Sequence, residues 1–215
     1  MTLALTLLAP SRLWLLVLVA ALAAAAAGGV AASALAFGAL WPSGGAGDAP
    51  AAQPATLSAA DAATARAVVA QAERLVAVTP AQLGYRLRVA GPVPGLRGRT
   101  DTETRTITLY VGPQDSSGAV AHDLGHELGH AYDATRLSAA QRAAYLRARG
   151  VPGAPWTPGG RASDYRSGAG DFAEVFALCQ AASPVYRSRL AVRPQDPCSV
   201  LPKQARTAKL GGGGS

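Results

Sequence analysis

The stretch Gly118–Thr135, GAVAHDLGHELGHAYDAT, is predicted to form the helix around which the fold is organised. Its apolar residues recur at a helical period, which is typical of a helix with one face on the core. Gly125 and Gly129 lower its helix propensity, and we expect them to permit close packing against a neighbouring element or a substrate. The apolar face consists of Val120, Leu124, Leu128 and Ala131.

All three histidines of the chain lie in this stretch, and they are spaced four residues apart. Residues four apart share one face of a helix. His126 and His130 belong to an HExxH motif, so both can bind one Zn²⁺. Glu127 follows the first of them and can act as a general base on a water at the ion. His122 is one turn earlier, where it could support a ligand, be an alternative ligand or be an ordinary histidine.

A zinc ion held by two histidines needs a third protein ligand if one position is to stay open for water. The longer motif HExxHxxGxxH does not continue here, because Asp133 and Arg136 stand where its glycine and last histidine would be. We therefore expect a carboxylate from a later helix. Asp171 and Glu174 are three residues apart in DFAEVFALCQAA and can both face the first helix.

Two segments carry a family resemblance: HELGHAYD, which begins at His126, and DFAEVFA, which begins at Asp171. They resemble the gluzincin-like HExxH zinc metallopeptidases, particularly small bacterial members, and the catalytic domain of anthrax lethal factor. The resemblance covers about residues 104–182 and implies a zincin-like α+β fold that hydrolyses a peptide or protein substrate. Gly170 stands where the family usually carries its ligand glutamate. Either Asp171 takes over as the zinc ligand with Glu174 behind it, or Glu174 is itself the ligand.

The same resemblance suggests roles for Tyr165 and for one strand, and Asp133 is a further candidate on its own chemistry. Tyr165 precedes the second helix, like the tyrosine that stabilises the oxyanion in lethal factor, although ordinary loop packing is the alternative. Asp133 could orient a ligand histidine or cap the first helix. The strand Thr104–Val111 is expected to border the cleft and to bind extended peptide at its edge.

The capping signals and apolar periodicity in the rest of the chain predict an α+β domain over residues 58–202. A capping signal at Ser58 starts a helix that should run to about Val78. Residues 85–90 and 104–111 alternate as strands and could pair as a hairpin with a long loop.

Two more helices are expected after the motif, at about residues 137–149 and 171–182. Residues 150–160, rich in proline and glycine, could form a lid or a packed connection. The chain ends in a tail, residues 203–215, whose GGGGS is linker-like.

Leu13–Trp41 is almost uninterrupted apolar sequence and exceeds the ~20 residues that span a bilayer. We expect residues 1–41 to be an uncleaved transmembrane anchor, with a cleaved signal peptide as the alternative. Residues 42–57 read as an Ala/Gly/Pro linker. Both interpretations place the domain on the extracytoplasmic side, either anchored to the membrane or secreted.

The chain has a net charge of +7, and its eighteen arginines outnumber two lysines. These arginines are scattered and not interleaved with aromatic residues, so nucleic-acid binding is not expected. Cys179 and Cys198 form no CxxC pair, and in an exported domain they should form a disulfide. The sequence predicts no particular oligomeric state.

These observations favour a membrane-anchored zinc peptidase. The first alternative is a non-catalytic envelope module in which the zinc site is structural or lost. A zinc hydrolase acting on a non-peptide bond is the second.

Overall fold

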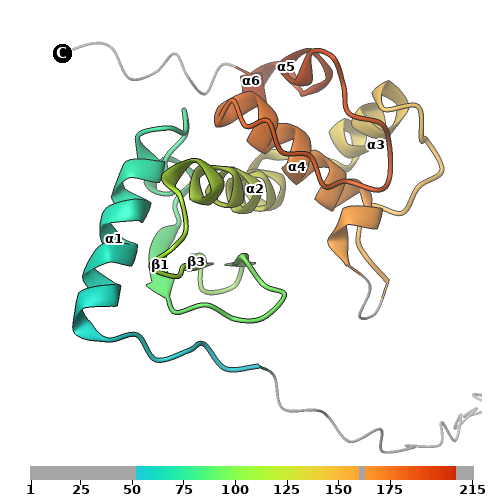
Figure 1. Ribbon diagram of the computed structural model, residues 1–215. Coiled ribbons are helices and arrows are strands. Elements are labelled where there is room, and N and C mark those ends of the chain that lie inside the picture. Colours follow the sequence, from blue (N-terminus) through green and yellow to red (C-terminus); the bar gives the residue numbers. More distant parts are fainter. Residues whose placement is uncertain (1–51, 160–162, 207–215) are drawn as a thin grey trace, which may run out of the picture. The chain divides into compact units, whose positions relative to one another are not determined.

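The computed structural model describes residues 52–159 and 163–206. The predicted membrane segment, most of the linker and the tail beyond residue 206 lie outside these ranges. Among the helices of the described ranges, none combines the length and the hydropathy that a membrane span requires. The described part is α+β, with helices packed on one small sheet (Figure 1).

The sheet has three strands: β1 (Arg86–Ala90), β2 (Gly98–Asp101) and β3 (Thr106–Tyr110). Their order is β1-β3-β2, with β3 parallel to β1 and antiparallel to β2. The predicted hairpin between the first and last strands is therefore wrong. β2, with the sequence GRTD, lacks the apolar alternation that reveals a strand, and it forms the hairpin with β3 instead.

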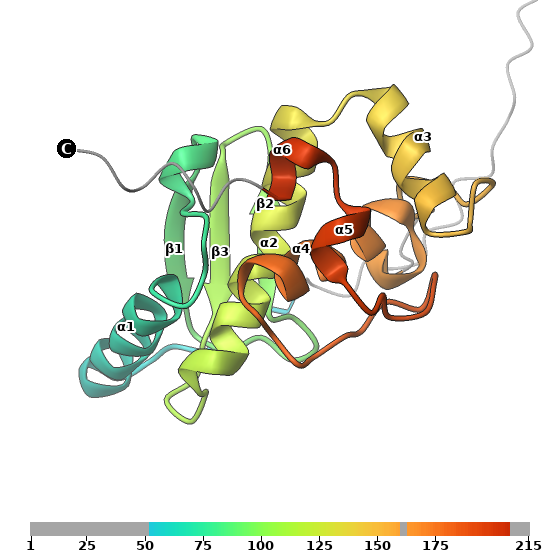
Figure 2. The ribbon, with the colours of Figure 1, turned by 90° about the horizontal axis from the view of Figure 1, so that it is seen from above.

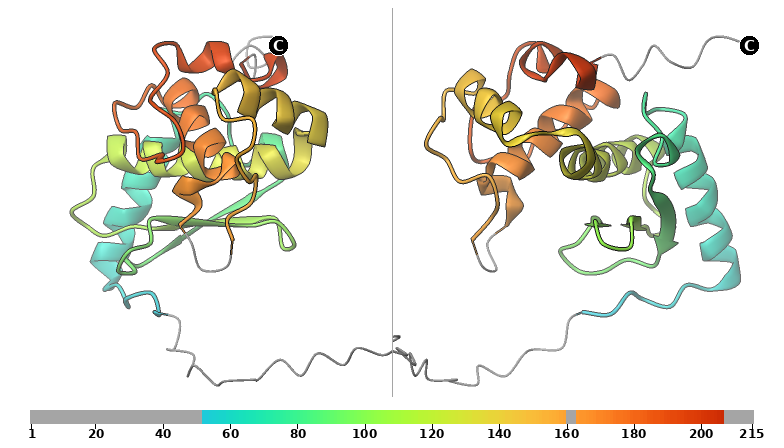
Figure 3. Two further views of the ribbon diagram at one scale, coloured as in Figure 1. Left: turned by 90° about the vertical axis from the view of Figure 1, so that its right-hand side faces the viewer. Right: turned by 180° about the vertical axis from the view of Figure 1, so that it is seen from behind.

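Strand alternation gives the sheet two different faces. Ile107 and Leu109 of β3 are fully buried beneath α2 (Ser117–Arg136), which carries the HExxH motif. Figure 2 shows α2 lying across the strands, with α4 (Gly168–Gln180) beside it. The opposite face of the sheet carries threonine and arginine and is covered by none of the described helices (Figure 3).

α2 and α4 pack closely because small residues meet along their contact. An added Cβ at Gly129 would lie 2.6 Å from the Cα of Ala173, and one at Gly125 would lie 3.0 Å from the Cα of Ala177. Both glycines therefore face α4, and no larger side chain fits there without moving backbone. Aromatic residues complete this contact, with the ring centroids of Tyr132 and Phe176 5.4 Å apart.

The other helices surround this pair. α1 (Ala59–Glu73) is capped by Ser58 as predicted, but it ends five residues before Val78. Val76 and Val78 are still buried, so their apolar character reflects core packing in an irregular segment and not more helix. α3 (Ala139–Ala148) begins with a capping box formed by Ser138 and Gln141.

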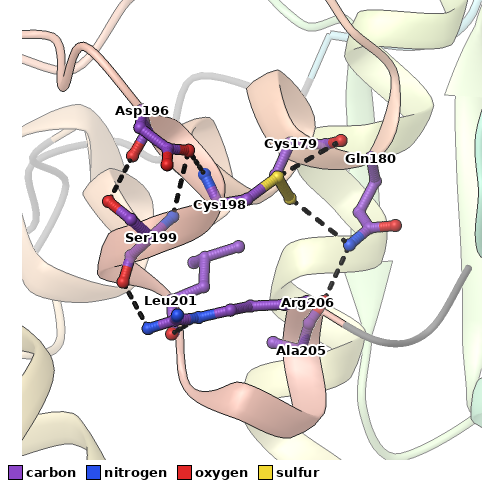
Figure 4. Close-up of a disulfide and its surroundings, with 8 residues drawn as sticks. All are labelled: Cys179, Gln180, Asp196, Cys198, Ser199, Leu201, Ala205 and Arg206. Carbon is purple, nitrogen blue, oxygen red and sulfur yellow. Dashed lines mark hydrogen bonds between the residues drawn. A yellow bond between two sulfur atoms is a disulfide. The ribbon is translucent and has the colours of Figure 1, made fainter.

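Two short helices were not predicted in the C-terminal segment, α5 (Pro197–Val200) and α6 (Lys203–Arg206). The disulfide Cys179–Cys198 joins α5 to α4, with the two Cα atoms 5.0 Å apart, and this confirms the predicted pairing (Figure 4). The Gln180 amide donates to the Ala205 carbonyl at 2.7 Å and so joins α6 to the same helix.

Gly129→Ala should destabilise the domain although alanine is the better helix former. The higher helix propensity of alanine adds up to ~1 kcal/mol to the free energy of unfolding. The new methyl group collides with the α4 backbone, however, and such overpacking lowers the free energy of unfolding by about 1–3 kcal/mol. Gly118→Ala is the matched control, because a Cβ there meets nothing within 4 Å and should be neutral or stabilising. Denaturant unfolding would measure both. Equal stability of the two variants would contradict the packing role.

Candidate metal centre

Three side chains converge at one end of the α2–α4 contact. His126 and His130 lie one turn apart on α2, with their Nε2 atoms 3.1 Å from each other. Asp164 Oδ2 lies 3.0 Å from each of these nitrogens. The triangle is small enough for one ion to contact all three atoms at the ~2.0–2.2 Å typical of zinc. Two imidazoles and one carboxylate are also a ligand set that leaves a zinc position open.

The α4 side of the site orients the first histidine. His126 Nδ1 lies 2.8 Å from Oε1 of Glu174, which is completely buried. The other carboxylate oxygen of Glu174 accepts a hydrogen bond from the backbone N–H of Arg187. With the Nδ1 proton donated to Glu174, Nε2 of His126 presents the lone pair that a metal requires. Glu174 therefore supports a ligand from behind and does not face the triangle.

The electrostatics of the three groups suit a cation. Burial alone would lower the pKa of His126, but its bonds to Asp164 and Glu174 outweigh this and raise it to about 10. For the acids, contacts with histidines outweigh burial in the other direction. His122 and His126 lower the pKa of Glu174 to about 2, and His126 and His130 lower the pKa of Asp164 well below its usual range. Two ionised carboxylates thus converge on one imidazole, and a divalent ion fits this excess of negative charge.

Asp171, one of the two expected ligands, is engaged elsewhere. Its carboxylate forms a buried ion pair with Arg149, at 2.7 Å from Nε, and accepts further hydrogen bonds from hydroxyl groups. This network joins α4 to α3 and to the C-terminal segment. Neither Asp171 nor Glu174 belongs to the cluster of His126, His130 and Asp164, so the expectation that α4 supplies the third ligand stays a prediction, with Asp164 as a further candidate. The hydroxyl donors are Tyr145, Tyr186 and Ser188.

Asp164 lies beside the two histidines, and a close backbone contact with α4 accompanies this placement. It begins the short 3-10 helix η2 (Asp164–Arg166), and a Cβ on Gly170 would lie only 2.1 Å from its carbonyl oxygen. Gly170 therefore makes room for the backbone that carries the Asp164 carboxylate. One sequence signal could have found it, since Asp164 is the only acid between Asp133 and Asp171.

Glu127 lies between the triangle and the sheet. Its Oε2 is 2.8 Å from the hydroxyl of Thr100 on β2. A Cβ on Gly98 would lie 2.6 Å from its Oε1, so the strand passes directly against this carboxylate. The strand that borders the site is consequently β2. The strand expected to border the cleft, Thr104–Val111, corresponds to β3, which is central in the sheet and has no free edge.

A cavity of about 390 Å³ opens in front of Glu127. Tyr165 lines it, with its ring centroid 5.4 Å from that of His126. Burial raises the pKa of this tyrosine, against a smaller opposing effect of Arg187. One wall is held by Asp123, which accepts from Arg97 Nε at 2.9 Å and from Arg187 Nη1 at 2.8 Å.

The remaining sequence candidates lie outside the triangle. His122 is fully buried, with Nε2 3.3 Å from Glu174 Oε1 but not aligned for a hydrogen bond. Asp133 accepts from Arg142 Nε at 2.7 Å and from Trp156 Nε1 at 2.9 Å. It therefore joins α2 to α3 and to the proline-rich loop, whose Trp156 packs against Phe172 of α4.

No family model, no curated protein and no solved structure matches the chain. The chemistry of the site consequently has to be argued from its own geometry.

Substitutions should separate the three acids by their effect on zinc affinity. Asp164→Ala should cost more than the roughly 10–100-fold typical of a residue that only supports a ligand, whereas Glu174→Gln should fall within that range. Asp171→Asn should keep its zinc affinity and lose about 3 kcal/mol of stability, because Arg149 is left buried without its counter-charge. Chelator competition would measure the affinity and denaturant unfolding the stability.

Circular dichroism should first establish that each variant is folded. If a folded Asp171→Asn variant loses as much zinc affinity as Asp164→Ala does, this assignment of the third ligand is contradicted.

Proposed function

We propose that this protein is a zinc-dependent peptidase, anchored to the membrane and acting on its extracytoplasmic side. The observation that supports this best is the triangle of His126, His130 and Asp164 with Glu127 directly beside it. The spacing of the motif and the resemblance to gluzincin-like metallopeptidases point to the same chemistry.

A zinc ion in this triangle would lower the pKa of a bound water toward ~7 and polarise the scissile carbonyl. Glu127 would accept the proton of the attacking water and deliver it to the leaving amine. Thr100 orients that carboxylate by donating to it from β2. The Tyr165 hydroxyl lines the same cavity and would stabilise the negative charge that develops on the carbonyl oxygen.

β2 supports a peptide as the substrate. It is an edge strand, and its outer side has no strand partner among the described residues. An extended peptide can add to such an edge through backbone hydrogen bonds. Because Gly98 brings the strand within contact distance of Glu127, a peptide bound there would pass the metal centre.

The arrangement argues against a purely structural zinc site. Structural sites have four protein ligands, whereas the cluster found within the described residues has three. His122, the remaining histidine, lies nearest to Glu174 and is not part of this cluster.

Glu127→Gln should separate catalysis from metal binding. The variant keeps the shape of the side chain and removes the base, so we expect near-stoichiometric zinc, an unchanged melting temperature and a turnover at least ~10²-fold lower. His126→Ala should lose zinc as well as activity, because two ligands hold the ion poorly. Metal analysis, thermal melting and hydrolysis of a broad peptide library should be compared side by side.

A structural site gives the opposite pattern, in which Glu127→Gln is silent and His126→Ala unfolds the domain. Fully zinc-loaded wild-type protein that cleaves nothing and matches Glu127→Gln in every assay would refute the peptidase proposal.

A further inference from the structure

The sheet has an outer face, which points away from α2 and has no helix over it in the described part of the chain (Figures 1 and 3). Register and alternation define its members, because Ile107 and Leu109 point to the α2 side and their neighbours on β3 point away. The residues of the outer face are Arg86, Arg88, Ala90, Arg99, Asp101, Thr106, Thr108 and Tyr110.

Arginine dominates the charge of this outer face. Thr108 pairs with Arg88 on β1 and with Arg99 on β2, so two guanidinium groups flank it across neighbouring strands. Arg86 lies two residues before Arg88 on the same side. All three arginines are exposed, and within the described ranges none of them forms an ion pair.

One acid accompanies these arginines on the outer face. Asp101 Oδ1 accepts hydrogen bonds from the backbone N–H groups of Glu103 and Thr104, at 3.0 and 2.8 Å. Its carboxylate thus holds the β2–β3 turn, and the outer face keeps a net positive charge.

The chain enters the described domain on this side. Pro54 lines a groove of about 600 Å³ together with Arg88, Arg99 and Tyr110. The backbone N–H of Ala55 donates to the Pro92 carbonyl at 3.0 Å and fixes the entering segment against the sheet.

The length of the preceding chain limits how far this face can lie from the predicted membrane segment. Ten residues, 42–51, separate Trp41 from the first described residue, Ala52. Ten residues reach at most about 35 Å when fully extended and average about 17 Å as a random coil. If residues 13–41 span the membrane, this length of chain keeps Ala52 and the groove lined by Pro54 within about 35 Å of the bilayer.

We propose that the outer face docks on the anionic phospholipid headgroups of the membrane that holds the N-terminal segment. Guanidinium groups bind phosphate oxygens in a bidentate manner, and each arginine at an anionic surface strengthens the association about fivefold. β2 presents Arg99 to the outer face and Thr100 to Glu127, so docking holds the candidate cleft at a fixed height above the bilayer. The proposal rests on the membrane anchor and is independent of zinc and of hydrolysis.

Arginine footprinting of the full chain tests this directly. The protein is placed in lipid nanodiscs of either pure phosphatidylcholine or phosphatidylcholine with phosphatidylglycerol, and modification by phenylglyoxal is followed at each arginine by mass spectrometry. Arg86, Arg88 and Arg99 should react at least about fivefold more slowly in the anionic discs, and 0.5 M salt should remove the difference. Arg74 and Arg147, which are exposed on α1 and α3, should react equally in both.

A pair of variants tests whether the arginines act together. Arg86→Gln/Arg88→Gln should restore the reactivity of Arg99 in anionic discs, whereas the matched Arg74→Gln/Arg147→Gln should not.

Three results would overturn the proposal. The first is equal reactivity of the three arginines in both kinds of disc. The second is that the full chain does not enter the discs and that anionic vesicles also leave these arginines unprotected, and the third is that soluble polyphosphate protects them but anionic lipid does not. The last result would assign the face to a soluble polyanion.

Discussion

The close approach of α2 and α4 is the constraint on which the rest of the molecule depends. It requires glycine at positions 125 and 129, because any larger residue meets the α4 backbone. The same approach brings Glu174 within 2.8 Å of His126 Nδ1, so the packing of the core also sets the orientation of this histidine. Stability and chemistry are therefore coupled through one helix pair, and a change that separates the helices should disturb both.

The local part of the site could be predicted from the sequence, and the tertiary part could not. Four-residue spacing on one helix determines that His126 and His130 share a face, whatever surrounds them. The position of Asp164 beside them depends instead on tertiary structure such as the contact between Gly170 and the Asp164 backbone, which no periodicity records. In the sheet, β3 was readable from its alternation, whereas the GRTD sequence of β2 carries no apolar pattern. The disulfide was predictable because only two cysteines exist.

The C-terminal segment, although irregular, holds the site from behind. Its backbone N–H at Arg187 binds Glu174, and its Arg189 N–H donates to the Tyr165 carbonyl at 2.8 Å. The disulfide Cys179–Cys198 closes this segment into a loop on α4, which limits the conformations available to it in the unfolded chain. The disulfide therefore favours the arrangement in which this segment contacts Glu174 and Tyr165.

The distribution of charge separates buried acids from exposed arginines within one small basic domain. The whole chain contains thirteen acidic residues and twenty lysines and arginines. Five of the acidic residues are buried around α2 and α4. Three of these five, Asp123, Asp133 and Asp171, form ion pairs with arginines. Glu174 orients His126 of the candidate metal centre, while the arginines on the outer face of the sheet form no ion pair within the described ranges. β2 separates the two regions, since successive residues of one strand point to opposite sides.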